Sequence, residues 1–180
     1  MMETKISGTI LEIERGDITN QNVEAVVNAA NAQLKMGGGV AGAIHRAAGS
    51  KLSKETKKLA PIKPGEAVLS KAYNLPNKYI IHCLGPVWGR DKPEDKILAR
   101  CYKNALQIAD NNEIRSIAFP AISTGAFGYP TEEAARVALN AVGEKTEELN
   151  NVSKIRFVLY TKKDYIVHKR ILNSMNKTKN

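Results

Sequence analysis

The segment Val26–Gly49 constrains the fold of this chain more than any other part of the sequence, V-V-N-A-A-N-A-Q-L-K-M-G-G-G-V-A-G-A-I-H-R-A-A-G. A short apolar run leads into Asn28 and Asn31, and the glycine run Gly37–Gly39 precedes a helical pattern. Glycines adopt positive φ readily and let the backbone come close to a ligand. A glycine loop that opens a helix directs free N–H groups and the helix dipole at one point, which suits phosphate. The segment therefore predicts a strand, an anion-binding loop and a helix, in that order.

Length and composition indicate one compact domain. The chain has 180 residues, 43% of them hydrophobic, which is enough for a core that stands alone. We expect a single domain over residues 1–180, with 173–180 as a flexible tail. No apolar run reaches the roughly 18 residues of a membrane span, and residues 1–15 lack the apolar core of a secretory signal. We therefore expect a cytoplasmic protein with no membrane partner.

The cysteines and the net charge limit the kinds of site and partner that this chain can have. Cys83 and Cys101 belong to no C-x-x-C pair, so buried free thiols in a reducing compartment are expected rather than a disulfide or a metal site. The formal charge of +9 fits a polyanionic partner such as nucleic acid or a phosphate-rich ligand. However, the lysines cluster in 51–58 and 162–179 without regular interleaving of aromatic residues, which is more typical of solvated surface.

Hydrophobic patterning predicts strands that alternate with helices. A strand is expected over 6–14, where the alternation slips at Ile10-Leu11 as in a bulged or edge strand. Further strands are expected over 24–29, 65–72, 78–84, 115–120 and 155–160. Helices are expected over 40–48, within 53–59, over 93–110, from a cap at Thr131, and from a cap at Asp164 through Asn173. This order favours a layered α/β fold, in which ligands bind at the carboxyl ends of the strands.

Two further elements follow predicted strands directly. One is the loop Pro120–Gly128, P-A-I-S-T-G-A-F-G, which alone is as consistent with an ordinary turn as with phosphate contact. The other is Gly16-Asp17-Ile18-Thr19, where an aspartate before a threonine commonly makes a turn or a cap. Each of these signals is weak by itself. Their order and separation along the chain are more informative than either signal alone.

Together the motifs resemble the macrodomain family of ADP-ribose-binding modules. G-D-I-T, N-A-A-N…G-G-G-V-A-G-A-I…A-A-G, I-I-H-C-L-G-P-V-W and A-F-P-A-I-S-T-G-A-F-G-Y-P follow in the order of that family, from about Ile10 to Tyr160. The resemblance implies a three-layer α/β/α sandwich with a mixed, mostly parallel six-stranded central sheet. It also implies that ADP-ribose lies in a cleft along the strand ends.

The resemblance assigns the adenine end of that cleft. Asp17 is placed like the aspartate that accepts a hydrogen bond from the adenine amino group, with the Ile18 backbone beside it. An ionised carboxylate only accepts hydrogen bonds, so it can select an amino-bearing purine. Tyr160, at the end of the last strand, is placed like the aromatic residue that stacks on adenine. The alternative for Tyr160 is a core tyrosine with its hydroxyl at the rim.

The two glycine loops are expected to hold the diphosphate from two sides. Backbone N–H groups suit this task because they are fixed before the ligand arrives and lose little entropy. The expected contacts there are Gly37, Gly38, Gly39, Val40, Ala41, Ser123, Thr124, Gly125, Ala126 and Phe127. By the same resemblance Asn31 hydrogen-bonds the distal ribose and Phe127 packs against it. Asn28 is expected to hold the loop through its amide, and Lys35 is a peripheral candidate.

Whether the chain also catalyses a reaction depends on few residues. A large subgroup of the family has an aspartate directly after G-G-G-V, where this chain has Ala41, although other branches with G-G-G-V-A are active. Among the alternatives, His45 and His82 are more consistent with packed residues, and the loop gives Ser123 no base. Asn31 is therefore the expected catalytic residue: it and the loops position a water with help from the substrate's own phosphate.

Two functions stay open at this point. The first is slow, metal-independent hydrolysis of the distal-ribose linkage in ADP-ribosylated acidic side chains or O-acetyl-ADP-ribose, with ADP-ribose-1''-phosphate as a further family substrate. The second is a non-catalytic reader of ADP-ribose or poly-ADP-ribose. Poly-ADP-ribose or nucleic acid could also bind the basic surface, with a steep loss of affinity in salt. No cofactor is expected, no residue cluster has metal-ligand spacing, and the chain is expected to be a monomer.

Overall fold

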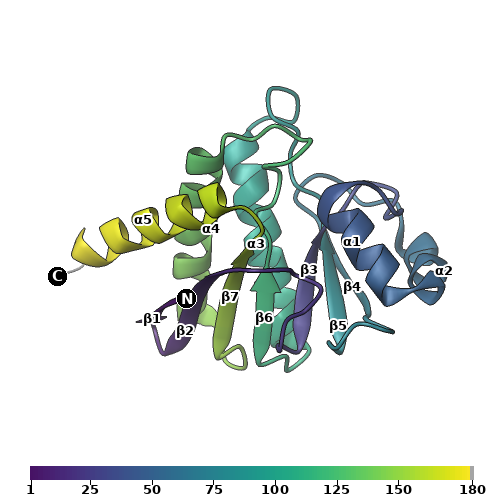
Figure 1. Ribbon diagram of the computed structural model, residues 1–180, viewed down its shortest axis with the longest axis horizontal. Coiled ribbons are helices and arrows are strands. Elements are labelled where there is room, and N and C mark those ends of the chain that lie inside the picture. Colours follow the sequence, from purple (N-terminus) through teal and green to yellow (C-terminus); the bar gives the residue numbers. More distant parts are fainter. Residues whose placement is uncertain (179–180) are drawn as a thin grey trace.

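The computed structural model describes residues 1–178 of the chain. Strands and helices alternate along them, as the patterning predicts (Figure 1). In chain order the elements are β1 (Met2–Ile6), β2 (Thr9–Arg15), β3 (Ala25–Ala29), α1 (Gly39–Ala48), α2 (Ser50–Leu59), β4 (Ala67–Lys71), β5 (Tyr79–Cys83), α3 (Glu94–Asn111), β6 (Ser116–Phe119), α4 (Thr131–Lys145), the 3-10 turn η1 (Thr146–Glu148), β7 (Lys154–Leu159) and α5 (Lys162–Thr178).

All strands join one mixed sheet in the order β1-β2-β7-β6-β3-β5-β4. The five inner strands are parallel to one another, and only the two edge strands, β1 and β4, run antiparallel to them. The loops that follow β2, β3, β5, β6 and β7 therefore leave the sheet at the same edge. This arrangement gathers the glycine loops, Asp17 and Tyr160 at one end of the molecule.

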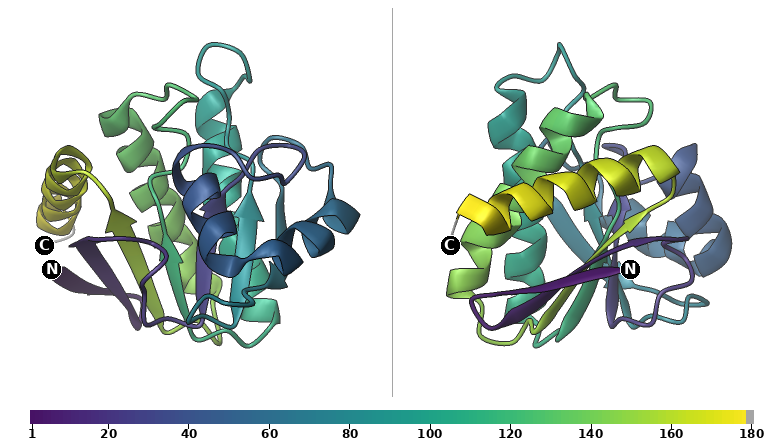
Figure 2. Two further views of the ribbon diagram at one scale, coloured as in Figure 1. Left: turned by 45° about the vertical axis from the view of Figure 1, so that its right-hand side comes forward. Right: turned by 60° about the vertical axis from the view of Figure 1, so that its left-hand side comes forward.

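Helices cover both faces of the sheet, which makes the three-layer α/β/α sandwich that the resemblance implies. Helices α1 and α2 lie on one side, and α3 and α4 lie on the other (Figure 2). Successive residues of β3 show the alternation: Val26 packs with Ile44 and Leu52 of the first pair, whereas Val27 packs in the larger core with α3, α4 and α5. A parallel sheet buried on both faces requires such apolar runs.

The single strand expected over 6–14 is wrong in one respect. The chain turns between β1 and β2, and these two strands form a hairpin. β1 pairs with β2 from Met2↔Ile13 to Ile6↔Thr9. Ser7 and Gly8 form the two-residue turn with φ of 46° and 88°, as the right-handed twist of hairpin strands favours. The sheet therefore has seven strands rather than six. β1 was not recognisable because Glu3 and Lys5 alternate with half-buried residues on an edge strand.

Two expected helix caps are also wrong. Thr131 is the first residue of α4, and the cap position is held by Pro130 without a side-chain hydrogen bond. α5 begins at Lys162, and the residue before it, Thr161, accepts a hydrogen bond from the Asp164 N–H at 3.0 Å and donates one to the Asp164 carboxylate at 2.7 Å. Thr161 and Asp164 thus form a reciprocal cap.

The last helix is longer than expected. α5 extends to Thr178 rather than ending at Asn173, so most of the tail expected over 173–180 is helical. The final two positions of that tail lie outside the described residues, and its flexibility stays a prediction.

A buried ion cluster joins β2 and β7. The Glu12 carboxylate of β2 is 4% exposed and accepts a 2.6 Å hydrogen bond from Arg156 Nε of β7, while Lys154 Nζ lies 3.3 Å away. Arg156 also donates to the Gln21 side chain at 3.0 Å. Burial opposes ionisation of Glu12, but Arg156 and Lys154 outweigh it and hold the pKa of this carboxyl below its ordinary value.

Glu12→Gln is expected to lower the free energy of unfolding by about 2 kcal/mol, less than a fully orphaned buried charge costs, because Arg156 keeps Gln21 as a partner. The lowered pKa means that this stabilisation is present above the ordinary pKa of a carboxyl and is lost as the pH falls through the folded value. Urea unfolding at neutral pH should show the difference, and the two proteins should converge once the pH falls below the lowered pKa of Glu12 in the folded protein. Glu14→Gln on the same strand is the control and should change stability by less than about 0.5 kcal/mol.

Candidate functional site

The N-terminus of α1 presents unpaired backbone donors. Its cap residue, Gly38, makes no side-chain cap hydrogen bond, and the first turn carries no acidic residue. The first closing bond of the helix is from the Gly42 N–H to the Gly38 carbonyl at 3.2 Å, so the preceding N–H groups have no helical partner. With the helix dipole they form a site of positive potential.

Gly42 allows the loop to fold tightly onto this helix. A Cβ at Gly42 would collide with the backbone carbonyl oxygen of Gly37 and would lie 3.0 Å from Arg46 Nη1. Gly39, at φ +53°, lies in the left-handed region that favours glycine. The glycine run therefore provides a fixed position for the N–H groups, which any side chain at Gly42 would disturb.

The second glycine loop follows β6 and presents donors of the same kind. Its internal hydrogen bonds use the N–H groups of Gly128, bound to Gly125 O at 3.0 Å, and of Tyr129, bound to Ser123 O at 2.9 Å. Within residues 1–178, no partner is found for the N–H groups of Gly125, Ala126 or Phe127. These three amides are therefore available to an anion.

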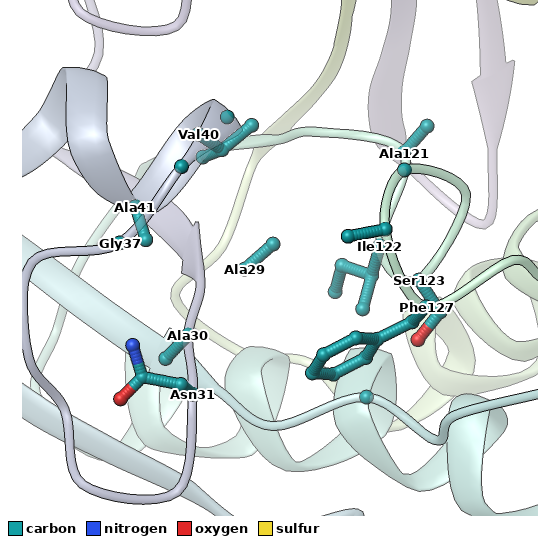
Figure 3. Close-up of a pocket in the computed structure, with 15 residues that line it drawn as sticks. Ala29, Ala30, Asn31, Gly37, Val40, Ala41, Ala121, Ile122, Ser123 and Phe127 are labelled. Carbon is teal, nitrogen blue, oxygen red and sulfur yellow. The ribbon is translucent and has the colours of Figure 1, made fainter.

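The loops are the opposite walls of one cavity. It measures about 260 Å³ and is lined by Ala29, Ala30, Asn31, Gly37, Gly38, Gly39, Val40, Ala41, Gly85, Ala121, Ile122, Ser123, Gly125, Ala126 and Phe127 (Figure 3). A second cavity of about 520 Å³ adjoins it and is lined by residues that include Asp17, Ile18, Thr124 and Tyr160. Gly39, Val40, Ala121 and Gly125 line both, so the two form one elongated cleft across the strand ends.

All the ligand-binding residues expected from the sequence line this cleft, and the two ends differ in character. At the Asp17 end, the carboxylate is exposed and its Oδ1 accepts hydrogen bonds from the Thr19 N–H at 2.8 Å and hydroxyl at 2.7 Å. The turn reading of this motif is therefore correct, and the carboxylate also borders the cavity. Tyr160 is 79% exposed, so the alternative of a core tyrosine is wrong.

At the other end Asn31 lines the cavity, but its side-chain amide is hydrogen-bonded to its own loop. Its Nδ2 donates to the Lys35 carbonyl at 2.8 Å, and its Oδ1 accepts from the Lys35 N–H at 3.0 Å. In Figure 3 the Asn31 amide points into its own loop, whereas the Phe127 ring extends from the opposite loop toward the Asn31 side. Asn31 thus fixes the loop that carries Gly37. The Lys35 side chain is exposed and belongs to neither cavity.

His82 and His45 are buried and line neither cavity of the cleft. His82 accepts a hydrogen bond from Asn28 Nδ2 at 3.0 Å and bonds Ser70 Oγ at 2.8 Å, and burial lowers the pKa of His82 to about 3. Asn28 therefore ties β3 to β5. The expectation that its amide holds the glycine loop is wrong. His45 lies 3.4 Å from Ser53 Oγ, lines neither cavity, and has its pKa lowered by burial. Both histidines are packed residues, as expected.

Sequence reasoning missed Gly85 and Arg46. A Cβ at Gly85 would collide with Ser123 Oγ and would lie 2.6 Å from Ile122 Cγ2, so Gly85 lets the β6 loop pack beside the end of β5. Its signal was the glycine that directly follows the apolar strand I-I-H-C-L. Arg46 lines the Asp17 end from the third turn of α1, and a lone exposed arginine on a helix gives no signal in the sequence.

Two other classes of site are absent from the described residues. No group of three or more histidine, cysteine, aspartate or glutamate side chains in residues 1–178 could hold a metal ion. No helix in that part of the chain combines the length and the apolar character needed to cross a membrane. Cys83 and Cys101 are buried free thiols, and each donates a hydrogen bond to a backbone carbonyl.

An α/β/α sandwich with two glycine loops at the strand ends defines a class of nucleotide-phosphate-binding folds. Residues 27–138 match the family model described as Macro domain. The chain is 46% identical over 168 residues, 91% of its length and 96% of the relative's, to an O-acetyl-ADP-ribose deacetylase from Klebsiella pneumoniae. It belongs to the macrodomain family.

Solved macrodomains have the same fold. A macrodomain from Oceanobacillus iheyensis, solved with ADP, superposes with a TM-score of 0.94 at 38% identity, covering 98% of this chain and 97% of that one. One from Trypanosoma brucei, solved with ADP-ribose, has a TM-score of 0.85 at 36% identity, covering 90% of this chain and 68% of that one. The expected fold family is confirmed.

Proposed function

We propose that this chain binds ADP-ribose along the cleft. The observation that carries the proposal is the pair of facing donor sets, at the N-terminus of α1 and in the Gly125–Phe127 segment, on the two walls of one cavity. Two sets of fixed N–H groups suit a diphosphate. The adjoining cavity with an exposed tyrosine and a carboxylate suits an amino-bearing purine. The solved relatives with ADP and ADP-ribose support the same ligand.

In this arrangement each end of the ligand has its own contacts. Asp17 accepts a hydrogen bond from the adenine amino group beside the Ile18 backbone, and Tyr160 stacks on the ring. The diphosphate binds between the two donor sets, with the remaining loop contacts from Val40, Ala41, Ser123 and Thr124. The distal ribose then lies at the Asn31 end of the cleft, against Phe127.

We further propose that the chain slowly hydrolyses the linkage between the distal ribose and an acyl group. Water adds across the ester, which releases ADP-ribose and a carboxylic acid. Ala41 supplies no carboxylate to orient that water, so the substrate's own phosphate and the loop donors position it. Asn31 acts as a positioning residue, since its amide holds the loop through Lys35. The deacetylase name of a 46% identical relative supports this activity.

The second candidate function is a reader of ADP-ribose without turnover. It is favoured by the absence of a general base near Ser123 among the described residues, where the hydroxyl is buried without a partner. Calorimetric titration with ADP-ribose, followed by a turnover assay on the same sample with Glu-linked ADP-ribosylated protein and O-acetyl-ADP-ribose, separates the two. Binding with release indicates the hydrolase, and binding alone indicates the reader. Absence of binding would contradict both.

Tyr160→Ala is expected to weaken ADP-ribose binding about tenfold, because stacking of a base on an aromatic ring contributes about 1–3 kcal/mol. The side chain is 79% exposed, so its removal should leave the free energy of unfolding nearly unchanged. Tyr160→Phe is the control and should bind with wild-type affinity, since it keeps the ring. Equal affinity of the alanine variant in calorimetry would remove Tyr160 from the proposed adenine site.

A further inference from the structure

Helix α2 presents a basic surface with little compensating charge. Its lysines, at positions 51, 54, 57 and 58, are all exposed. Among the described residues, none of the four forms an ion pair. The only carboxylate of the helix, Glu55, is occupied by hydrogen bonds from the Tyr73 hydroxyl at 2.7 Å and the Lys71 N–H at 3.2 Å. The outer face of α2 is therefore free to attract an anionic partner.

A groove lies between α2 and the loop that follows β3. It measures about 510 Å³ and is lined by Gln33, Leu34, Lys35, Met36, Ser53, Thr56, Lys57 and Ala60. Met36 is 53% exposed, and exposed apolar side chains in a hollow favour contact with a partner. Lys35 and Lys57 border the groove from its two sides. Its character is thus partly apolar and strongly basic.

The groove is separated from the ligand cavity only by the 31–37 loop. Asn31 and Gly37 line the cavity, whereas Lys35 and Met36 line the groove. The two hydrogen bonds between the Asn31 amide and the Lys35 backbone hold these surfaces in a fixed relation. Figure 2 shows the loop arching above α1 on the side of the sheet that α2 shares.

We propose that α2 and this groove bind an acidic polypeptide segment that flanks the ADP-ribosylated side chain of a protein substrate. The inference rests on the proposed function, in which the distal ribose and its substituent lie at the Asn31 end of the cleft. A polypeptide attached there passes the groove as it leaves. α2, at about 15 Å, is as long as about five extended residues, so carboxylates on such a segment reach its lysines.

The chemistry of the surface favours polypeptide over nucleic acid. Single-stranded nucleic acids need aromatic side chains on which bases stack, and neither α2 nor the groove lining contains one. Met36 instead offers a flexible apolar contact of the kind that accommodates varied peptide side chains. The exposed lysines of α2 supply charge complementarity to an acidic segment.

The test compares the affinities of three probes for the full chain. These are free ADP-ribose, a Glu-rich peptide that carries one ADP-ribose through a non-hydrolysable linkage, and the same conjugate with its flanking glutamates changed to glutamines. At about 0.02 M salt we expect the acidic conjugate to bind about tenfold more tightly than the other two probes, and the difference to vanish at about 1 M salt, where the Debye length is about 3 Å.

The variant with Lys54→Glu and Lys57→Glu should lose this gain and keep its affinity for free ADP-ribose, which also shows that it is folded. The variant with Lys5→Glu and Lys169→Glu carries the same change in net charge on exposed residues of β1 and α5 and should keep the gain. Intact ADP-ribose binding without a gain from acidic flanks would overturn this inference alone. Failure of ADP-ribose itself to bind would overturn the proposed function. Tighter binding of a single-stranded oligonucleotide, lost in the α2 variant, would also overturn the inference.

Discussion

Gly42→Ala is expected to weaken ADP-ribose binding about 100-fold, because the loop donors lose their positions and hydrogen bonds to a charged group contribute about 1.5–3 kcal/mol each. The added Cβ would collide with the Gly37 carbonyl oxygen. A backbone atom cannot relieve the collision by changing rotamer, so the glycine loop must move away from α1. Its N–H groups then no longer point at the same position. Calorimetric titration with ADP-ribose measures the loss directly.

The same substitution elsewhere provides the control. Gly143 lies within α4, and a Cβ there would meet no atom within 4 Å. Gly143→Ala should therefore raise the free energy of unfolding by about 0.5–1 kcal/mol, because alanine restricts the unfolded chain and favours helix. It should leave ADP-ribose affinity unchanged. Wild-type affinity in the Gly42 variant would mean that the close approach of loop and helix has no part in binding.

The sequence predicted the parts of the fold that depend on apolar runs and missed the parts that depend on contacts between residues. The parallel inner strands were predictable, because Val26 and Val27 belong to an apolar run that only a sheet covered on both faces can bury. β1 was not, since its exposed Glu3 and Lys5 give a polar pattern, and its place depends on the turn at Ser7-Gly8. Helix starts failed for a similar reason: Thr161 and Asp164 both fit a cap, and only the three-dimensional contact distinguishes them.

The candidate site, too, could be predicted from the sequence only in part. Motifs identified the residues that line the cleft, since each follows a strand and the strand ends meet at one edge. They could not identify contacts between loops. That Gly85 must lack a Cβ depends on Ser123, which is distant in the sequence. That the Asn31 amide binds the Lys35 backbone depends on the path of a loop with no regular structure. Composition carries no information about either contact.

This last contact leads to the prediction that bears most on catalysis. Asn31→Ala is expected to lower the turnover of Glu-linked ADP-ribosylated protein about 100-fold, which is the cost of misplacing groups by about 1 Å. The variant loses both hydrogen bonds that fix the loop at the distal-ribose end. ADP-ribose affinity should fall less than about fivefold, since both bonds are made within the loop rather than to the ligand. Their total of about 2 kcal/mol is present in the free protein as well, so it affects affinity only through its change on binding. The effect should therefore appear in kcat rather than in KM.

Lys35→Ala separates this role from simple loop stability. It removes an exposed side chain but keeps the backbone N–H and carbonyl that bond the Asn31 amide. The substrate for this comparison is O-acetyl-ADP-ribose, which has no polypeptide to contact the groove. Its turnover by Lys35→Ala should stay at the wild-type level. Comparing the two variants with this small substrate tests the backbone contact alone. Equal release by wild type and Asn31→Ala would exclude the positioning role, and a matching loss in Lys35→Ala would transfer that role to the lysine side chain. A loss confined to Asn31→Ala would show that the water depends on a loop held by one amide, in a site where Ala41 leaves no carboxylate to hold it.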